Sequence, residues 1–412
     1  MAIEGGLIRE DGPFVGTSCM PWRQRGQGIR SPLAVNVDFT RGTIRARQGV
    51  SLFAPWETLT GDSSDRVMGM TGYRKRDGES LVVIIKLVNN VGLSYPWQLE
   101  FEVYDMTGST IATAVRLDQH PFAETPDPDN WYSFHQYNND LYIASRRGRV
   151  LKYNYEEEIG QPSYVKGREN SIAMLTLRTY PQGSIITEHN QHLVVGGFDG
   201  ETYHRLEEKL ADQQNLIDED SISTERRSIR LKRTEVIVSE APYGDMFQAD
   251  RIINFPSGGS ITGLASTGAG ILVLTERNIH LVQVNAPEAG TDIMPTVNQR
   301  MLMEGVDCVG HRTVVSGKGL TAWVASNGIF MFDGQKVTKI SDDLEDLWSS
   351  GRWNEPPIVA MGVKLAELGY PFVIQKARMD RAVGVFDPST NTFIWALPLA
   401  GHSDYNRLIL VY

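Results

Sequence analysis

The chain has 412 residues, of which 41% are hydrophobic, 22% charged and 9% aromatic, a globular composition that excludes disordered, collagen-like and coiled-coil architectures. Lysine and arginine number 40 against 50 acidic residues, so the net charge of −10 disfavours binding to nucleic acid through its phosphates. Cys19 and Cys308 are too few for a disulfide scaffold or a zinc cluster, and we expect both to be buried thiols. No secretory signal is visible and the strongest apolar run, residues 81–88, is too short to cross a membrane. We therefore expect a soluble protein that is made in a cytoplasm.

Residues 1–50 differ from the remainder in charge. They hold seven arginines, no lysine and four acids, which gives this segment a net charge of +3 and leaves −13 for the rest. We interpret them as an Arg-rich N-terminal arm that leads into a single domain over residues 51–412.

Short β-branched and aromatic runs, separated by turn residues, recur along the domain. Segments 131–153, 260–282 and 313–340 share one pattern of three successive strands, and weaker copies lie at 68–104, 183–198 and 359–397. Each unit is a small sheet that cannot bury its own faces, whereas units arranged around an axis bury one another. The pattern predicts an all-β fold, a β-propeller of about six (six or seven) four-stranded blades. Its inner or central strands are expected near residues 81–88, 141–145, 271–275 and 322–325.

Residues 205–233 also fall outside the repeat, and we interpret them as one long charged insertion. Leu206, Leu210 and Ile217 are spaced for one apolar helical stripe, and the segment is acidic through Asp220 and then strongly basic. We predict that the arm and the insertion carry subunit and adaptor contacts through Arg–carboxylate pairs. The alternative is a flexible tail and loop with no partner. The candidate interface residues are Arg23, Arg25, Arg30, Glu207, Glu208, Arg226, Arg227 and Arg230.

The motifs of common catalytic and cofactor sites are absent from the sequence. It has no phosphate loop, no dinucleotide fingerprint, no nucleophile elbow and no calcium loop. His189 and His192 are three residues apart, but their strand-like flanks favour a hairpin turn with exposed polar residues over a metal site. We expect no catalytic residue, no cofactor and no metal, although sites assembled from distant residues escape such a search.

Three stretches, in order along the chain, carry a family resemblance. They are residues 31–38 followed by 42–49, residues 258–265 with 272–280, and residues 323–334 (Trp-Val-Ala-Ser-Asn-Gly-Ile-Phe-Met-Phe-Asp-Gly) with Ile340-Ser341. Together they resemble the tail nozzle or tail-hub β-propellers of short-tailed bacteriophages. The chain is shorter than the larger nozzle proteins and has room for little beyond one propeller.

The resemblance implies a structural virion protein in the phage tail. Such a protein forms a homo-hexameric ring below the portal and adaptor, meets tail fibre or needle proteins, and forms part of the DNA exit channel. A net charge of −10 agrees with DNA passing through without tight binding. Two alternatives remain: a carbohydrate-binding or carbohydrate-cleaving propeller, such as a receptor-binding tail protein, and a cellular scaffold propeller that binds peptides on its rim.

Overall fold

The structure is a computed structural model, and it describes the parts of the chain that build six successive sheets. Short strands outside these parts are β1 (Phe14–Thr17) and β2 (Ile29–Ser31), which pair in parallel, and β3 (Val37–Asp38) and β4 (Arg45–Ala46), which pair antiparallel. The described residues are 66–89, 97–107, 109, 115–116, 130–137, 139–146, 150–153, 172–174, 181–205, 228–239, 247–284, 297–342, 348, 374–399 and 406–412, together with these four strands.

The first three sheets each have four antiparallel strands. The first sheet contains β5 (Arg66–Arg74), β6 (Ser80–Asn89), β7 (Trp97–Asp105) and β8 (Val115–Arg116). The second contains β9 (Tyr132–Tyr137), β10 (Asp140–Ser145), β11 (Leu151–Tyr153) and β12 (Ile172–Met174). The third contains β13 (Ile185–His189), β14 (His192–Gly196), β17 (Glu235–Ser239) and β18 (Phe247–Asn254).

The last three sheets repeat this antiparallel order, and the final one has three strands among the described residues. The fourth sheet contains β19 (Ile261–Thr267), β20 (Gly270–Thr275), β21 (Asn278–Val284) and β22 (Val297–Glu304). The fifth contains β23 (Val315–Gly317), β24 (Leu320–Ala325), β25 (Gly328–Phe332) and β26 (Val337–Lys339). The sixth contains β27 (Val383–Asp387), β28 (Thr392–Pro398) and β29 (Asn406–Val411). Two short 3-10 helices, η6 (His311–Thr313) and η9 (Lys376–Arg381), precede the fifth and sixth sheets.

Each second strand of the inner sheets is buried on both faces, which explains its continuous apolar sequence. In β20, Ile271 and Val273 pack with the third sheet, while Leu272 and Leu274 pack with the fifth. In β10, Leu141 and Ile143 likewise face the first sheet, and Tyr142 and Ala144 face the third. Alternating side chains therefore build a separate apolar core between each pair of successive sheets.

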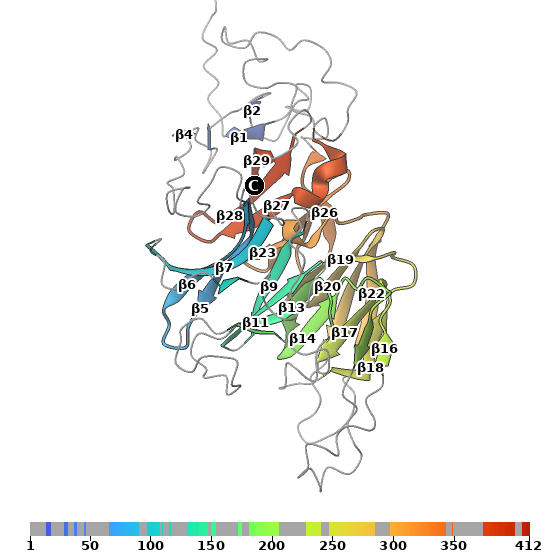
Figure 1. The fold of residues 1–412 in the computed structure, drawn as a ribbon. Helices are drawn as coiled ribbons and strands as arrows, with labels where there is room; N and C mark the ends of the chain where they lie inside the picture. Colours follow the sequence, from blue (N-terminus) through green and yellow to red (C-terminus); the bar gives the residue numbers. More distant parts are fainter. Residues whose placement is uncertain are drawn as a thin grey trace, which may run out of the picture.

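The first strands of successive sheets also lie next to one another. β5 contacts β9, β9 contacts β13, β13 contacts β19, β19 contacts β23, and β23 contacts β27. Glycine allows the last of these approaches, because a Cβ atom on Gly317 would lie 2.5 Å from the ring of Phe386. Figure 1 shows the sheets following one another in chain order, from the blue first sheet to the red sixth sheet.

These observations confirm the predicted all-β class. The four predicted strands are present within β6, β10, β20 and β24, and each is the second strand of its sheet, hydrogen-bonded on both sides. No helix in the described part of the chain has the length and apolar character to span a membrane.

Candidate functional sites: an apolar sheet face and a polar pocket

Arg230 is the one predicted interface residue whose side chain the structure describes. Arg230 is the last residue of β16 (Ser228–Arg230), which pairs with β15 (Tyr203–Arg205) in a separate two-stranded sheet. Both strands come after β14 and before β17 along the chain. Its Nε donates a hydrogen bond to the carbonyl oxygen of Gly200. The Nε of Arg233 donates to the Asp199 carbonyl oxygen at 2.6 Å. Both arginines therefore bind the loop that follows β14, within the same chain.

The other predicted interface residues have no described side chains. Arg30 lies in β2, of which the structure describes the backbone. The apolar helical stripe expected at residues 206–217 also lies outside the described residues, as do Arg23, Arg25, Glu207, Glu208, Arg226 and Arg227.

The sixth sheet presents an apolar face that no sequence motif indicated. Strand register places Val385, Ile394 and Val411 in one cross-strand row, and Val383, Ala396 and Ile409 in the next. We call these six residues the sixth-sheet face. Four of them are substantially exposed: Val385 at 58%, Ile409 at 49%, Val411 at 46% and Val383 at 38%. Tyr412, which directly follows β29, is 55% exposed.

The opposite face of this sheet is fully used in the core. Phe393, Trp395 and Leu397 are buried against the fifth sheet, and the Trp395 Nε1 donates to the Thr313 carbonyl oxygen at 3.0 Å. The sixth-sheet face is therefore the end of the series of packed sheets. Apolar residues in neighbouring rows on three strands form the kind of contiguous patch that marks an interaction surface.

Two smaller groups of exposed apolar residues lie elsewhere. Val67 and Met70 are on β5, the first strand of the first sheet, and Met70 is 61% exposed. Val297 and Met301 are on β22, the outermost strand of the fourth sheet.

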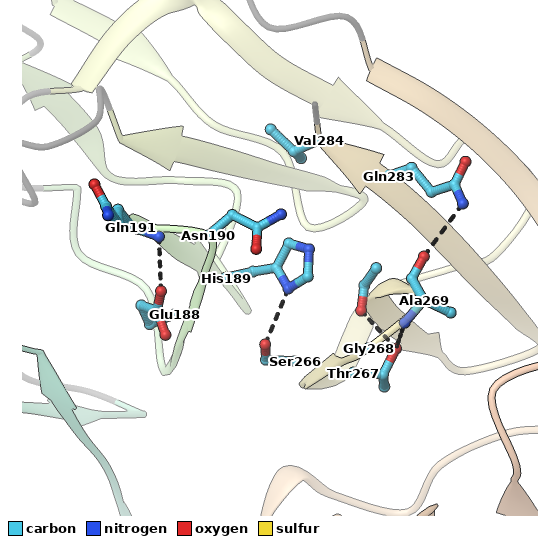
Figure 2. A pocket seen from close by; sticks show the side chains of 11 residues that line it. Glu188, His189, Asn190, Gln191, Ser266, Thr267, Gly268, Ala269, Gln283 and Val284 are labelled. Atoms are coloured by element: carbon cyan, nitrogen blue, oxygen red, sulfur yellow. Dashed lines mark hydrogen bonds between the residues drawn. The ribbon is translucent and has the colours of Figure 1, made fainter. Parts of the chain in front are cut away.

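A polar pocket of about 660 Å³ lies where the turn between β13 and β14 faces the turn between β19 and β20 (Figure 2). Residues 188–191 line it from the first turn and residues 266–270 from the second, and Gln283 and Val284 line it from β21. The pocket therefore lies between the third and fourth sheets, at one end of their first strands.

Local sequence fixes both turns. Asn190 and Gln191 have φ angles of 50° and 66°, as a two-residue hairpin turn requires, and asparagine tolerates this conformation well. The Gln191 backbone N–H donates to the Glu188 carboxylate at 2.7 Å. In the second turn, the Thr267 hydroxyl donates to the Gly270 carbonyl oxygen at 2.7 Å.

His189 and His192 are directly opposite each other across the first hairpin. The predicted hairpin is therefore present, but the prediction that its polar residues are exposed was wrong for both histidines, at 8% and 0% exposure. The His192 Nδ1 lies 2.7 Å from the Ser239 carbonyl oxygen, and the His189 Nδ1 lies 3.0 Å from the Ser266 hydroxyl. Both partners are distant in sequence, so the local pattern could not reveal them.

Burial lowers the pKa of His189, and the nearby Glu188 charge raises it by less. The imidazole is therefore neutral at pH 7 and has one donor and one acceptor nitrogen. In Figure 2 its second nitrogen points away from Ser266, toward the space between Asn190 and Gln283.

The His189–Ser266 pair resembles the nucleophile and base of a hydrolase only in part. Such a base is oriented by a third group. Glu188, the carboxylate in the pocket lining, instead accepts a hydrogen bond from the turn backbone. The arrangement suits hydrogen bonding to a ligand better than nucleophilic attack.

Two more histidines lie beside the first strands, His135 within β9 and His311 against Leu264 of β19. Burial, and secondarily the charge of His135 on β9, lower the pKa of His311 on η6 to about 4. The His311 Nδ1 accepts a long hydrogen bond, 3.4 Å, from the Leu264 backbone N–H. Within the described residues, no group of three or more His, Cys, Asp or Glu side chains is arranged to hold a metal ion.

The chain matches no protein-family model and no curated protein. Among solved structures it is similar to a protein of unknown function from Dyadobacter fermentans, at 8% identity and a TM-score of 0.38. That match covers 85% of this chain and 94% of the other.

Proposed function

We propose that this protein is a structural virion protein of a short-tailed bacteriophage, without catalytic activity. Its six sheets are the blades of a β-propeller, and its subunits assemble into a homo-hexameric ring below the portal and adaptor. The ring forms part of the DNA exit channel and meets tail fibre or needle proteins. The chain is made in the host cytoplasm and built into the virion tail.

The packing of the sheets supports the propeller. Blades around an axis place their first strands side by side and bury both faces of their central strands. Contacts between successive first strands run from β5 to β27, and the second strands of the second to fifth sheets are buried on both faces.

The sixth-sheet face is the observation that most directly supports assembly of the subunits into an oligomer. Its exposed valine and isoleucine side chains give a subunit an apolar surface to bury against another copy. A ring needs a second, different surface on each subunit. The exposed Val297 and Met301 on β22 provide a candidate for it.

Charge supports the passive role toward DNA. A net charge of −10 per subunit is multiplied in a ring, so the average field repels phosphates. Phosphate contacts would slow DNA as it leaves the capsid, and a channel wall without them avoids this.

Two measurements on the purified protein test the proposal. Light scattering should give the mass of a closed oligomer, and duplex DNA should show no sub-micromolar binding at about 150 mM salt. A monomer at all concentrations would contradict the ring, and tight DNA binding would contradict the passive channel.

A carbohydrate-binding function, as in a receptor-binding tail protein, is the second candidate. The polar pocket between the third and fourth sheets is the observation that favours it.

A further inference from the structure

The chemistry of the pocket lining is polar and almost entirely neutral. Carboxamides come from Asn190, Gln191 and Gln283, and hydroxyls come from Ser266 and Thr267. The residues that line the pocket include no lysine or arginine, so the pocket offers no cation to hold a phosphate or carboxylate. Its chemistry therefore favours an uncharged ligand that forms many hydrogen bonds.

His189 provides the most firmly placed of these groups. It is 8% exposed, and its Nδ1 is fixed by the Ser266 hydroxyl at 3.0 Å. The second ring nitrogen faces the pocket (Figure 2) and is either a donor or an acceptor, depending on the tautomer. A ligand hydroxyl both donates and accepts, so it satisfies this nitrogen in either state.

The remaining walls fit the same ligand class. The Glu188 carboxylate accepts from the turn backbone at 2.7 Å, which directs it to the turn. The Gln283 amide donates to the Ala269 carbonyl oxygen at 3.3 Å, which holds it at the rim. Ala269 and Val284 add small apolar surfaces suited to the C–H groups of a sugar ring.

We propose that this pocket binds a neutral saccharide. Asn190, His189 and Gln283 hydrogen-bond its hydroxyl groups, while Ala269 and Val284 contact its carbon skeleton. The site is built from the end of β13, the turn that follows it and the fourth sheet, whereas the proposed assembly uses the sixth-sheet face. Saccharide binding therefore stands or falls independently of ring formation.

Saturation-transfer NMR of the full chain tests this with four probes, namely maltose, cellobiose, lactose and N,N′-diacetylchitobiose, at up to about 10 mM. Asn190→Gly removes the pocket amide but keeps a residue that tolerates the φ of 50°. Its matched control is Asn391→Gly, at a φ of 59° in the turn between β27 and β28.

A second variant blocks the pocket by volume. Gly268→Leu adds a side chain at the pocket mouth, where a Cβ atom would meet nothing within 4 Å, so the fold tolerates it. Gly72→Leu is the control, because a Cβ atom on this β5 residue also meets nothing within 4 Å.

We expect at least one probe to bind, with affinity lowered about tenfold or more by Asn190→Gly and Gly268→Leu and unchanged by either control. Absence of saturation transfer to all four disaccharides would overturn the proposal. Binding that both pocket variants retain, or that the controls also lose, would overturn it as well.

Discussion

Replacing Val385 by aspartate on the sixth-sheet face should dissociate the assembly without unfolding the subunit. The valine is 58% exposed in the subunit, and its neighbours in the face, Ile409 and Val411, are about half exposed. The side chain therefore has much surface still to bury against a second copy. An aspartate in its place would bring a charge into that apolar contact.

The substitution should weaken the subunit contact much more than it lowers the stability of the isolated subunit. Full burial of a valine side chain contributes about 1.5–3 kcal/mol, so burying the exposed half of Val385 contributes about 1 kcal/mol to the contact. Desolvating an unpaired carboxylate costs several kcal/mol more. Together these weaken each subunit contact by at least about 3 kcal/mol, or more than about 100-fold. In the isolated subunit an exposed substitution changes stability by about 0.5 kcal/mol or less.

Mass photometry and thermal unfolding of Val385→Asp measure the two quantities. The control is Met106→Asp, because Met106 is 62% exposed and lies outside the sixth-sheet face. We expect the Val385 variant to be a monomer with a wild-type Tm and the control to remain assembled. If the Val385 variant assembles like the wild type, the sixth-sheet face is not the subunit interface.

Three further predictions concern the packed sheets. The pKa of His311 is about 4 in the folded protein against about 6.5 in the unfolded chain, so the unfolded chain binds more protons between these pH values. Denaturant titrations should therefore show the free energy of unfolding falling by up to about 3 kcal/mol as the pH drops from 6.5 to 4. The variant His311→Gln should flatten this pH profile. Gly317→Ala places a methyl group against the Phe386 ring and should cost about 1–3 kcal/mol in chemical denaturation, and an unchanged midpoint would contradict the close approach of β23 and β27. Burial raises the pKa of the Cys308 thiol to about 12, so the thiol should be unreactive in the folded protein near pH 8. In the variant Cys19→Ser, thiol reagents should therefore label the unfolded chain but not the native protein.

The sequence predicts the central strands well because their burial is two-sided. Residues 271–275 and 322–325 are continuous β-branched, aliphatic or aromatic runs, and each is a strand that packs on two neighbouring sheets. Cys308 is buried as expected, whereas Cys19 lies outside the described residues.

The candidate sites depend on information that a single strand does not carry. Val383 and Val385 look like core residues in sequence, and they are exposed because the sixth sheet is the last in the series. Ser266 is 77 residues from His189, so only the contact between β13 and β19 brings the pair together. The same contact buries a histidine whose local hairpin suggested exposure.

Electron microscopy of the purified protein tests the central claim most directly. Class averages should show a ring of subunits, each with six blades arranged around its own axis and with the outer face of the sixth blade against a neighbouring subunit. Separate particles with no ring, even at high protein concentration, would contradict the assembly, and a stack of sheets without a common axis would contradict the propeller.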